Sequence, residues 1–244
     1  MEPAAVGPGG ACGRASANVS MVIAETFTSI QGEGMLAGVP SFFIRTSGCN
    51  LRCAWCDTPY TSWRPEGSRR GVEELVSEAV ASGCRHVVVT GGEPLLQREL
   101  ADLTRELAAA GCHITVETAG TVAPEFTCTL LSISPKTANS DPDGRFRARH
   151  VALRTESKPL RTLLARHREY QLKFVVRDEG DLGEVLALVE RLNVPGERVL
   201  LMPEGRSAEE VAGRRRSVAA LCLRHGFRYS PRLHLDLFGA GRGV

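Results

Sequence analysis

The sequence lacks the features that mark several classes of protein. No apolar run approaches the roughly 20 residues that a membrane span needs. The net charge is only +2, which is too small to indicate nucleic acid or a membrane surface as an obligatory partner. Residues 1–20 contain no basic start followed by an apolar run, so they do not form a secretory signal. We predict a disordered extension over these residues and a cytoplasmic protein.

The cysteines also lack the regular spacing of a disulfide framework. Of the eight cysteines, five are scattered along the chain: Cys12, Cys84, Cys112, Cys128 and Cys222. A chain of 244 residues with 43% hydrophobic content can bury a core without disulfides. We therefore interpret these five as small core hydrophobes in a reduced compartment, with Cys12 incidental in the extension. A secreted, disulfide-bonded protein is the less favoured alternative.

Apolar, β-branched runs alternate with helical patterns along the rest of the chain. Strands followed by helices predict parallel pairing and right-handed crossovers, hence an α/β fold. About six such units predict an open, partial β/α barrel in a single domain over 21–244, with its active site at the C-terminal strand ends. The expected strands are 21–27, 41–47, 86–92, 113–120, 129–136, 171–177, 198–204 and 227–235. The expected helices are 72–83, 96–111, 157–168, 180–192 and 207–226. The segments 58–71 and 137–150 are expected to be loops, the second polar and mobile.

The stretch GCNLRCAWCDT places Cys49, Cys53 and Cys56 at Cys-x3-Cys-x2-Cys spacing. A structural zinc site closes with four protein ligands, and no second cysteine pair exists in this chain. A ferredoxin-type cluster also takes four cysteines. Three thiolates leave one iron of a four-iron cluster open to a ligand that is not protein. Zinc binding and redox sensing remain the alternatives.

This spacing, with Trp55 before the last cysteine, resembles the signature of radical S-adenosylmethionine (SAM) enzymes. The resemblance implies that Cys49, Cys53 and Cys56 hold a [4Fe-4S] cluster whose open iron binds SAM, and that the reduced cluster cleaves SAM to an adenosyl radical. The turn TGGEP, residues 90–94, follows a strand and allows close backbone approach to the SAM amino group. Alone, such a turn is equally typical of a tight strand–helix connection.

Finer motifs resemble the 7-carboxy-7-deazaguanine synthase family over residues 21–244. They are SIQGEG, CDT after the third cysteine, ETAG, SPK, QLKFVV, LMPEG and the terminal RLHLDLFGAGRGV. The family converts 6-carboxy-5,6,7,8-tetrahydropterin to 7-carboxy-7-deazaguanine with loss of ammonia, in queuosine and 7-deazapurine biosynthesis. It uses Mg²⁺ and regenerates SAM. The resemblance also implies a homodimer and a flavodoxin or ferredoxin as electron donor. Another radical SAM enzyme, such as a glycyl-radical activase, and a non-catalytic zinc or iron–sulfur module are the alternatives.

The resemblance also implies which residues contact SAM: Gly92, Glu93, Glu117, Ser134, Pro135, Lys136, Gln171, Leu172, Lys173 and Phe174. Polar side chains in this set suit the ribose hydroxyls and the SAM carboxylate. A lysine at a strand end is otherwise explained by its charged head reaching solvent. Met202 and Pro203 suit an apolar wall for adenine, and core packing explains them equally well.

The implied substrate contacts are Ile30, Gln31, Gly32, Arg45, Thr90 and Val244. The planar guanidinium of Arg45 suits the substrate carboxylate, with an ordinary ion pair as the alternative. The family uses the terminal carboxylate, here that of Val244, although a frayed terminus is the simpler expectation. In the family, the threonine matching Thr58 binds Mg²⁺, a cation that prefers oxygen ligands. The roles of Glu33, Asp57 and His234 stay open.

Overall fold

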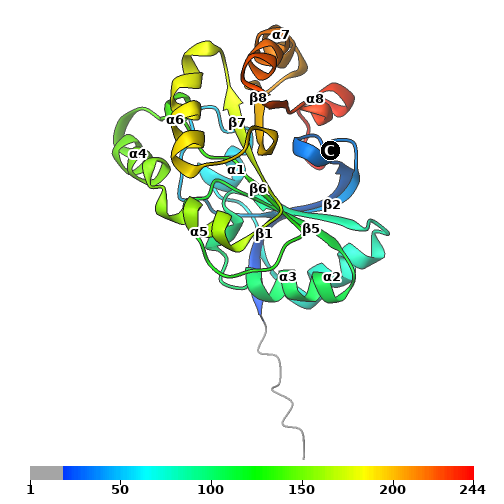
Figure 1. Ribbon diagram of the computed structural model, residues 1–244. Coiled ribbons are helices and arrows are strands. Elements are labelled where there is room, and N and C mark those ends of the chain that lie inside the picture. Colours follow the sequence, from blue (N-terminus) through cyan, green and yellow to red (C-terminus); the bar gives the residue numbers. More distant parts are fainter. Residues whose placement is uncertain (1–18) are drawn as a thin grey trace, which may run out of the picture.

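One nine-stranded sheet organises residues 19–244, the part of the chain that the computed structural model describes (Figure 1). The predicted extension, with Cys12, lies outside these residues except for its last two positions, and Ser20 already opens β1. The strand order is β3-β1-β2-β4-β5-β6-β7-β8-β9. The strands are β1 (Ser20–Ile30), β2 (Pro40–Thr46), β3 (Ser68–Gly71), β4 (His86–Gly91), β5 (His113–Thr118), β6 (Leu130–Ile133), β7 (Tyr170–Val176), β8 (Val199–Pro203) and β9 (Arg228–Tyr229).

The sheet is parallel from β2 to β9, in agreement with the predicted α/β fold. Strand β1 pairs antiparallel with β2, because only a short connection without a crossover helix joins them. Strand β3 adds a second antiparallel strand at the edge. Since β3 and β9 do not pair with each other, the barrel is open, as predicted.

The longer helices lie on the outside of the curved sheet (Figure 1). They are α2 (Val72–Ala81), α3 (Leu100–Ala109), α4 (Arg147–Thr155), α5 (Lys158–Arg166), α6 (Leu182–Leu192) and α7 (Ala208–His225). The short helices α1 (Pro59–Ser62) and α8 (Leu233–Phe238) instead contribute residues to the inner side. Alternation along the strands divides their side chains between two faces. On β7, Leu172 and Phe174 are fully buried in the apolar core, whereas Lys173 and Val175 line a cavity on the inner side.

Within residues 19–244, no helix combines the length and the apolar character that crossing a membrane requires.

Several predicted segments differ from the structure. The strand predicted over 129–136 already ends at Ile133. The strand predicted over 227–235 is too long: β9 spans only two of its residues and α8 follows. Pro231 separates them, because proline has no N–H for the strand ladder. The predicted loop 58–71 contains α1 and β3. The predicted loop 137–150 contains two 3-10 turns and the start of α4, and its Asn139 and Ser140 are buried.

A buried histidine, His86, at the N-terminal end of β4 makes the free energy of unfolding depend on pH. The ring of His86 contacts Ser41 Oγ at 2.6 Å and Thr115 Oγ1 at 2.8 Å, and lies 4.9 Å from the His113 ring. Burial, and then the neighbouring His113, lower the pKa of His86 from 6.5 to about 4. Between these values the unfolded chain binds a proton that the folded chain excludes, so stability falls as pH falls.

We expect this histidine to cost about 2 kcal/mol of unfolding free energy between pH 7 and pH 5. Urea unfolding of the cluster-free chain at both pH values measures the loss. A His86→Gln variant should lose correspondingly less stability over the same interval. Parallel losses in the two proteins would contradict the assignment.

Candidate active site

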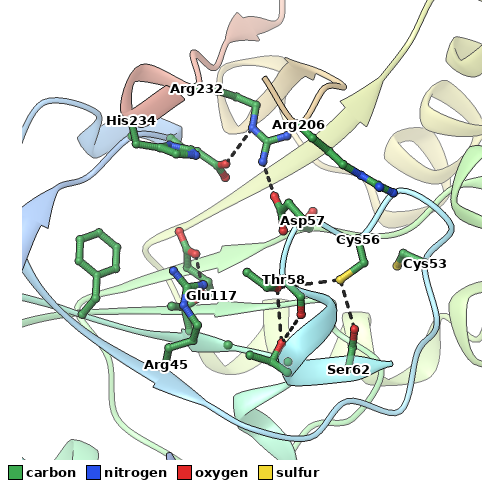
Figure 2. Close-up of a pocket in the computed structure, with 18 of the residues that line it drawn as sticks. Arg45, Cys53, Cys56, Asp57, Thr58, Ser62, Glu117, Arg206, Arg232 and His234 are labelled. Atoms are coloured by element: carbon green, nitrogen blue, oxygen red, sulfur yellow. Dashed lines mark hydrogen bonds and ion pairs between the residues drawn. The ribbon is translucent and has the colours of Figure 1, made fainter. Parts of the chain in front are cut away.

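A cavity of about 480 Å³ opens at the C-terminal ends of the parallel strands. Figure 2 shows Cys53 and Cys56 on one side of it and Arg45 and Glu117 on the other, with Thr58 between them. Fifteen of the predicted site residues line this one cavity: Ile30, Gln31, Gly32, Arg45, Cys49, Cys53, Cys56, Thr58, Thr90, Gly92, Glu117, Ser134, Lys136, Lys173 and Val244.

The three cysteines lie on a loop that is fixed by backbone contacts. Gly48, at φ +97°, donates its N–H to the Thr61 carbonyl at 2.8 Å. The Trp63 indole donates to the Cys53 carbonyl at 3.0 Å, and the Arg52 guanidinium donates to the Cys49 carbonyl at 2.7 Å. These contacts hold the backbone of the loop independently of any ligand on the sulfurs.

The chemistry of the three thiols fits a cluster. Burial raises the pKa of Cys49 to about 11 and that of Cys53 to about 12. Thiolates therefore need a positively charged metal centre to be stable at this place. Among residues 19–244, no group of three or more His, Cys, Asp or Glu side chains could hold a single metal ion. A four-iron cluster does not require such convergence, since each cysteine binds its own iron. No fourth described cysteine lines the cavity.

The Gly-Gly turn after β4 packs directly against the cysteine loop. Gly92 donates its N–H to the Thr46 carbonyl at 3.1 Å, and the next N–H, that of Glu93, reaches the Gly48 carbonyl at 2.9 Å. A Cβ at Gly91 would lie 2.1 Å from the Thr46 carbonyl oxygen, and one at Gly92 would lie 2.2 Å from that of Gly48. Only glycine allows the two backbones this approach.

A Gly92→Ala variant should therefore lose SAM binding and about 1–3 kcal/mol of stability, because the backbone must move apart. Equilibrium dialysis with SAM and urea unfolding measure the two effects. Gly213→Ala is the matched control: it lies in α7 with no atom within 4 Å of the added Cβ. We expect the control to bind SAM normally and to gain about 0.5–1 kcal/mol. Unchanged SAM affinity in Gly92→Ala contradicts this role for the turn.

The structure places five of the predicted SAM contacts outside the cavity lining: Glu93, Pro135, Gln171, Leu172 and Phe174. The Glu93 carboxylate is fully buried and accepts hydrogen bonds from Thr118 Oγ1 at 2.7 Å and from the Ala119 N–H at 2.9 Å. Burial raises its pKa. Glu93 thus ties the Gly-Gly turn to the end of β5.

Gln171 bridges two parts of the chain. Its amide donates to Ser132 Oγ at 2.7 Å and accepts from the Met35 N–H at 2.8 Å. A Cβ at Gly34, which has φ +74°, would lie 2.3 Å from this amide. The glutamine therefore positions the segment between β1 and β2 above the sheet, and glycine is required there.

A polar network forms one wall of the cavity. Glu117 accepts hydrogen bonds from Gln31 Nε2 at 3.2 Å and from Thr90 Oγ1 at 2.9 Å. Its carboxylate also lies 3.8 Å from Lys173 Nζ, which forms a 2.5 Å ion pair with Glu33. An amide, a hydroxyl and carboxylates thus converge from four segments and can bind a flat, donor-rich ring.

A buried arginine that the sequence did not single out completes this side of the cavity. Arg232 pairs with Asp57 (Figure 2). It also donates to the Gly205 carbonyl, and its Nε lies 3.3 Å from Glu33. Burial alone would raise the pKa of Glu33, but Lys173 and Arg232 lower it well below its ordinary value. The pKa of Asp57 is likewise lowered by Arg232 against the effect of burial.

The structure shows where Glu33, Asp57 and His234 lie, the three residues whose roles the sequence left open. Asp57 and Glu33 hold Arg232, which joins the cysteine loop to the chain end. His234 packs against Gly32, where a Cβ would lie 2.0 Å from its Nδ1. Burial lowers the pKa of His234, so its ring is neutral at pH 7. Arg232 opens the RLHLDLFGAGRGV motif, but the motif alone did not single it out, because its partners lie as far as 175 positions away.

Arg45 belongs to a chain of contacts that reaches the C-terminal tail. Its Nε donates to Glu25 at 2.7 Å, and Tyr60 donates to the same carboxylate oxygen at 2.6 Å. The Arg242 guanidinium lies 3.6 Å from the centre of the Tyr60 ring and pairs with Glu66 at 2.9 Å. The tail residue Val244 thereby joins the cavity wall.

Thr58 stands at the N-terminus of α1, beside the cysteines. Its Oγ1 lies 3.9 Å from Cys56 Sγ and 3.4 Å from Thr61 Oγ1. The hydroxyl makes no side-chain cap for α1. It therefore stays available to a ligand in the cavity.

Comparison with known proteins gives a consistent pattern. The Radical SAM superfamily model matches residues 43–163. A 7-carboxy-7-deazaguanine synthase of Rhodopirellula baltica is 44% identical over 247 residues, covering 100% of this chain and 95% of that protein. The enzyme of Halobacterium salinarum is 44% identical and covers 90% and 91%. The crystal structure of QueE from Escherichia coli has a TM-score of 0.62 at 28% identity and covers 86% of this chain and 93% of that one.

Proposed function

Since this chain belongs to the 7-carboxy-7-deazaguanine synthase family of radical SAM enzymes, we propose that it converts 6-carboxy-5,6,7,8-tetrahydropterin to 7-carboxy-7-deazaguanine with release of ammonia. The reaction is a ring contraction in 7-deazapurine biosynthesis, and the enzyme is a lyase. The family and the fold class predicted from the sequence are both confirmed by these similarities. The glycyl-radical activase and the zinc module are not favoured.

One observation carries the proposal: a single cavity joins the three cysteines to a wall of hydrogen-bonding groups suited to a pterin. When bound, the cluster and SAM supply the radical that removes a hydrogen atom from the substrate. Cys49, Cys53 and Cys56 hold the cluster. The backbone of Gly92, with Ser134 and Lys136, provides polar groups for SAM.

The opposite wall orients the substrate. We assign the pterin ring edge to Gln31, Thr90 and Glu117, whose side chains already bond to one another. We assign the substrate carboxylate to Arg45, whose pairing with Glu25 uses Nε. Enclosure by these residues fixes the geometry and excludes water.

Magnesium at Thr58 is a further part of the proposal. The hydroxyl lies next to Cys56, in the cavity that holds Arg45. An oxygen ligand there can share a Mg²⁺ ion with the substrate carboxylate and bound waters. We expect Thr58→Val to lower kcat/KM about 10- to 100-fold and to remove most of the activation by Mg²⁺. Titration of activity with Mg²⁺ in both proteins measures this. If the variant keeps the activation of the wild type, Thr58 is not the ligand.

Anaerobic turnover tests the main proposal. The reconstituted protein receives SAM, dithionite, Mg²⁺ and 6-carboxytetrahydropterin, and mass spectrometry follows the products. Formation of 7-carboxy-7-deazaguanine supports the proposal. Formation of 5′-deoxyadenosine without that product would leave radical SAM chemistry in place and overturn the substrate.

The remaining expectations concern the protein's surroundings. We propose a flavodoxin or ferredoxin as the physiological reductant and a homodimer as the assembly, both from the family resemblance. A cytoplasmic location fits the seven described cysteines, all of which are free.

A further inference from the structure

We propose that an exposed basic and aromatic surface over the cysteine loop is the docking site of an acidic one-electron carrier protein. The surface consists of Arg52, Trp63, Arg145, Phe146, Arg147 and Arg149, and is called the arginine surface below. The inference rests on the proposed function, because a radical SAM reaction needs an electron delivered at this loop.

Aromatic and cationic side chains hold one another in place on this surface. Trp63 is 37% exposed and packs edge-to-face on Phe146, with 5.6 Å between the ring centres. The guanidinium groups of Arg52 and Arg145 lie 5.6 Å and 4.8 Å from the Phe146 ring. Partly exposed tryptophan and arginine side chains with restricted motion are typical of protein-binding surfaces.

The same side chains bond directly to the cluster-binding loop. Trp63 donates to the carbonyl of Cys53 at 3.0 Å, and Arg52 donates to the carbonyl of Cys49 at 2.7 Å. A protein seated on the arginine surface is therefore separated from the cysteine loop by a single layer of side chains.

Cys49 is reached from two sides. It lines the large cavity, and it also lines a second pocket of about 80 Å³ together with Asn50, Arg52, Phe146, Arg149 and His150. Neither Phe146 nor Arg149 lines the large cavity. A carrier on the arginine surface thus approaches the loop without competing with SAM or substrate.

The charge of this surface selects an acidic partner. Between residues 142 and 150 the chain carries three arginines and a single acidic residue, Asp143. Arg145 and Arg149 are exposed and form no ion pair within residues 19–244. Arg147 is 58% exposed and lies 3.7 Å from Asp141. The whole chain has a net charge of only +2. This local excess of positive charge therefore attracts an acidic partner to the arginine surface rather than to the rest of the molecule.

The step that the surface serves is a one-electron transfer. The reduced carrier loses one electron and the oxidised cluster gains one, while no bond forms or breaks. The contribution of the arginine surface is to hold the carrier close to the cysteine loop and to raise the rate of encounter.

Charge variants test the proposal. The variant Arg145→Gln/Arg147→Gln/Arg149→Gln is compared with Arg161→Gln/Arg191→Gln/Arg216→Gln, which removes the same charge from exposed positions elsewhere. The probe is an acidic flavodoxin with FMN in the hydroquinone form, added to the reconstituted enzyme at low salt. Its Kd is measured, together with the rate of cluster reduction by stopped-flow absorbance.

We expect the first variant to bind flavodoxin at least about tenfold more weakly and to be reduced correspondingly more slowly. The control variant should resemble the wild type. Formation of 5′-deoxyadenosine with dithionite, which needs no docking, should be equal in all three proteins. Equal losses in the two variants, or no loss in either, overturn the proposal.

A second measurement uses only the wild-type protein. Hydrogen exchange with and without flavodoxin should show protection over 50–63 and 142–150, and protection confined to another surface overturns the proposal. If the first variant loses affinity for an RNA oligonucleotide but keeps flavodoxin binding, the surface is a nucleic-acid site. Absence of 7-carboxy-7-deazaguanine with dithionite would overturn the proposed function alone, because flavodoxin binding is measured separately.

Discussion

A Cys53→Ala protein should form no stable iron–sulfur cluster and should produce 5′-deoxyadenosine at least about 10³-fold more slowly than the wild type, since loss of the reactive centre removes the catalysed path. Cys53 is 8% exposed and lies between the other two cysteines of the loop. Apart from Cys49, Cys53 and Cys56, no described cysteine lines the cavity, so no further thiol there can replace Cys53.

Iron and sulfide analysis after anaerobic reconstitution, with the absorbance of the cluster, measures the first effect. Cys112→Ala is the matched control, because Cys112 is a free cysteine outside the cavity. The control should keep its cluster and its activity. A full cluster and normal SAM cleavage in Cys53→Ala would end the assignment of the trio.

Replacing Lys173 with Met should destabilise the chain by about 3–5 kcal/mol, because it leaves the buried Glu33 carboxylate without its closest cation. Lys173 is 3% exposed, and its ammonium group lies 2.5 Å from Glu33 and 3.8 Å from Glu117. Burial lowers the pKa of Lys173, but the two carboxylates outweigh it and raise that pKa. Activity should fall as well, since the polar wall of the cavity loses the ammonium group that contacts both Glu33 and Glu117.

The pH dependence of this effect has a definite sign. The pKa of Glu33 is lowered in the folded protein from its ordinary value of 4.5, so the ion pair stabilises the fold above about pH 4.5. This stabilisation is lost as pH falls toward the lowered pKa. In Lys173→Met the pKa of Glu33 rises, so the destabilisation should be largest at neutral pH and smaller at pH 4.

Urea unfolding of the cluster-free chain measures these differences. The double variant Glu33→Gln/Lys173→Met should be more stable than Lys173→Met alone, because the unpaired charge is gone. Lys158→Met is the control for loss of an exposed lysine and should change stability by less than about 0.5 kcal/mol. A Lys173→Met chain as stable as the wild type contradicts the buried ion pair.

Local patterns were enough to predict much of this protein. The cysteine spacing, the Gly-Gly turn and the alternation of strands with helices each depend on residues close together in the sequence. These patterns predicted the family and the fold class. They also predicted that the site lies at the C-terminal ends of the strands. The motif matches also identified fifteen residues that line one cavity, and their individual roles remain predictions.

Only the tertiary structure decided what supports that cavity. Arg232 pairs with Asp57 across 175 positions, and Lys173 pairs with Glu33 across 140. The polar segment 137–150 looked like a loop by itself, yet Ser140 accepts a hydrogen bond from the Ala54 N–H of the cysteine loop. The stretch predicted as a last strand became α8, whose start bonds to Gly32. Such partners are distant in sequence, and burial sets their charge and shape, so no local pattern encodes them.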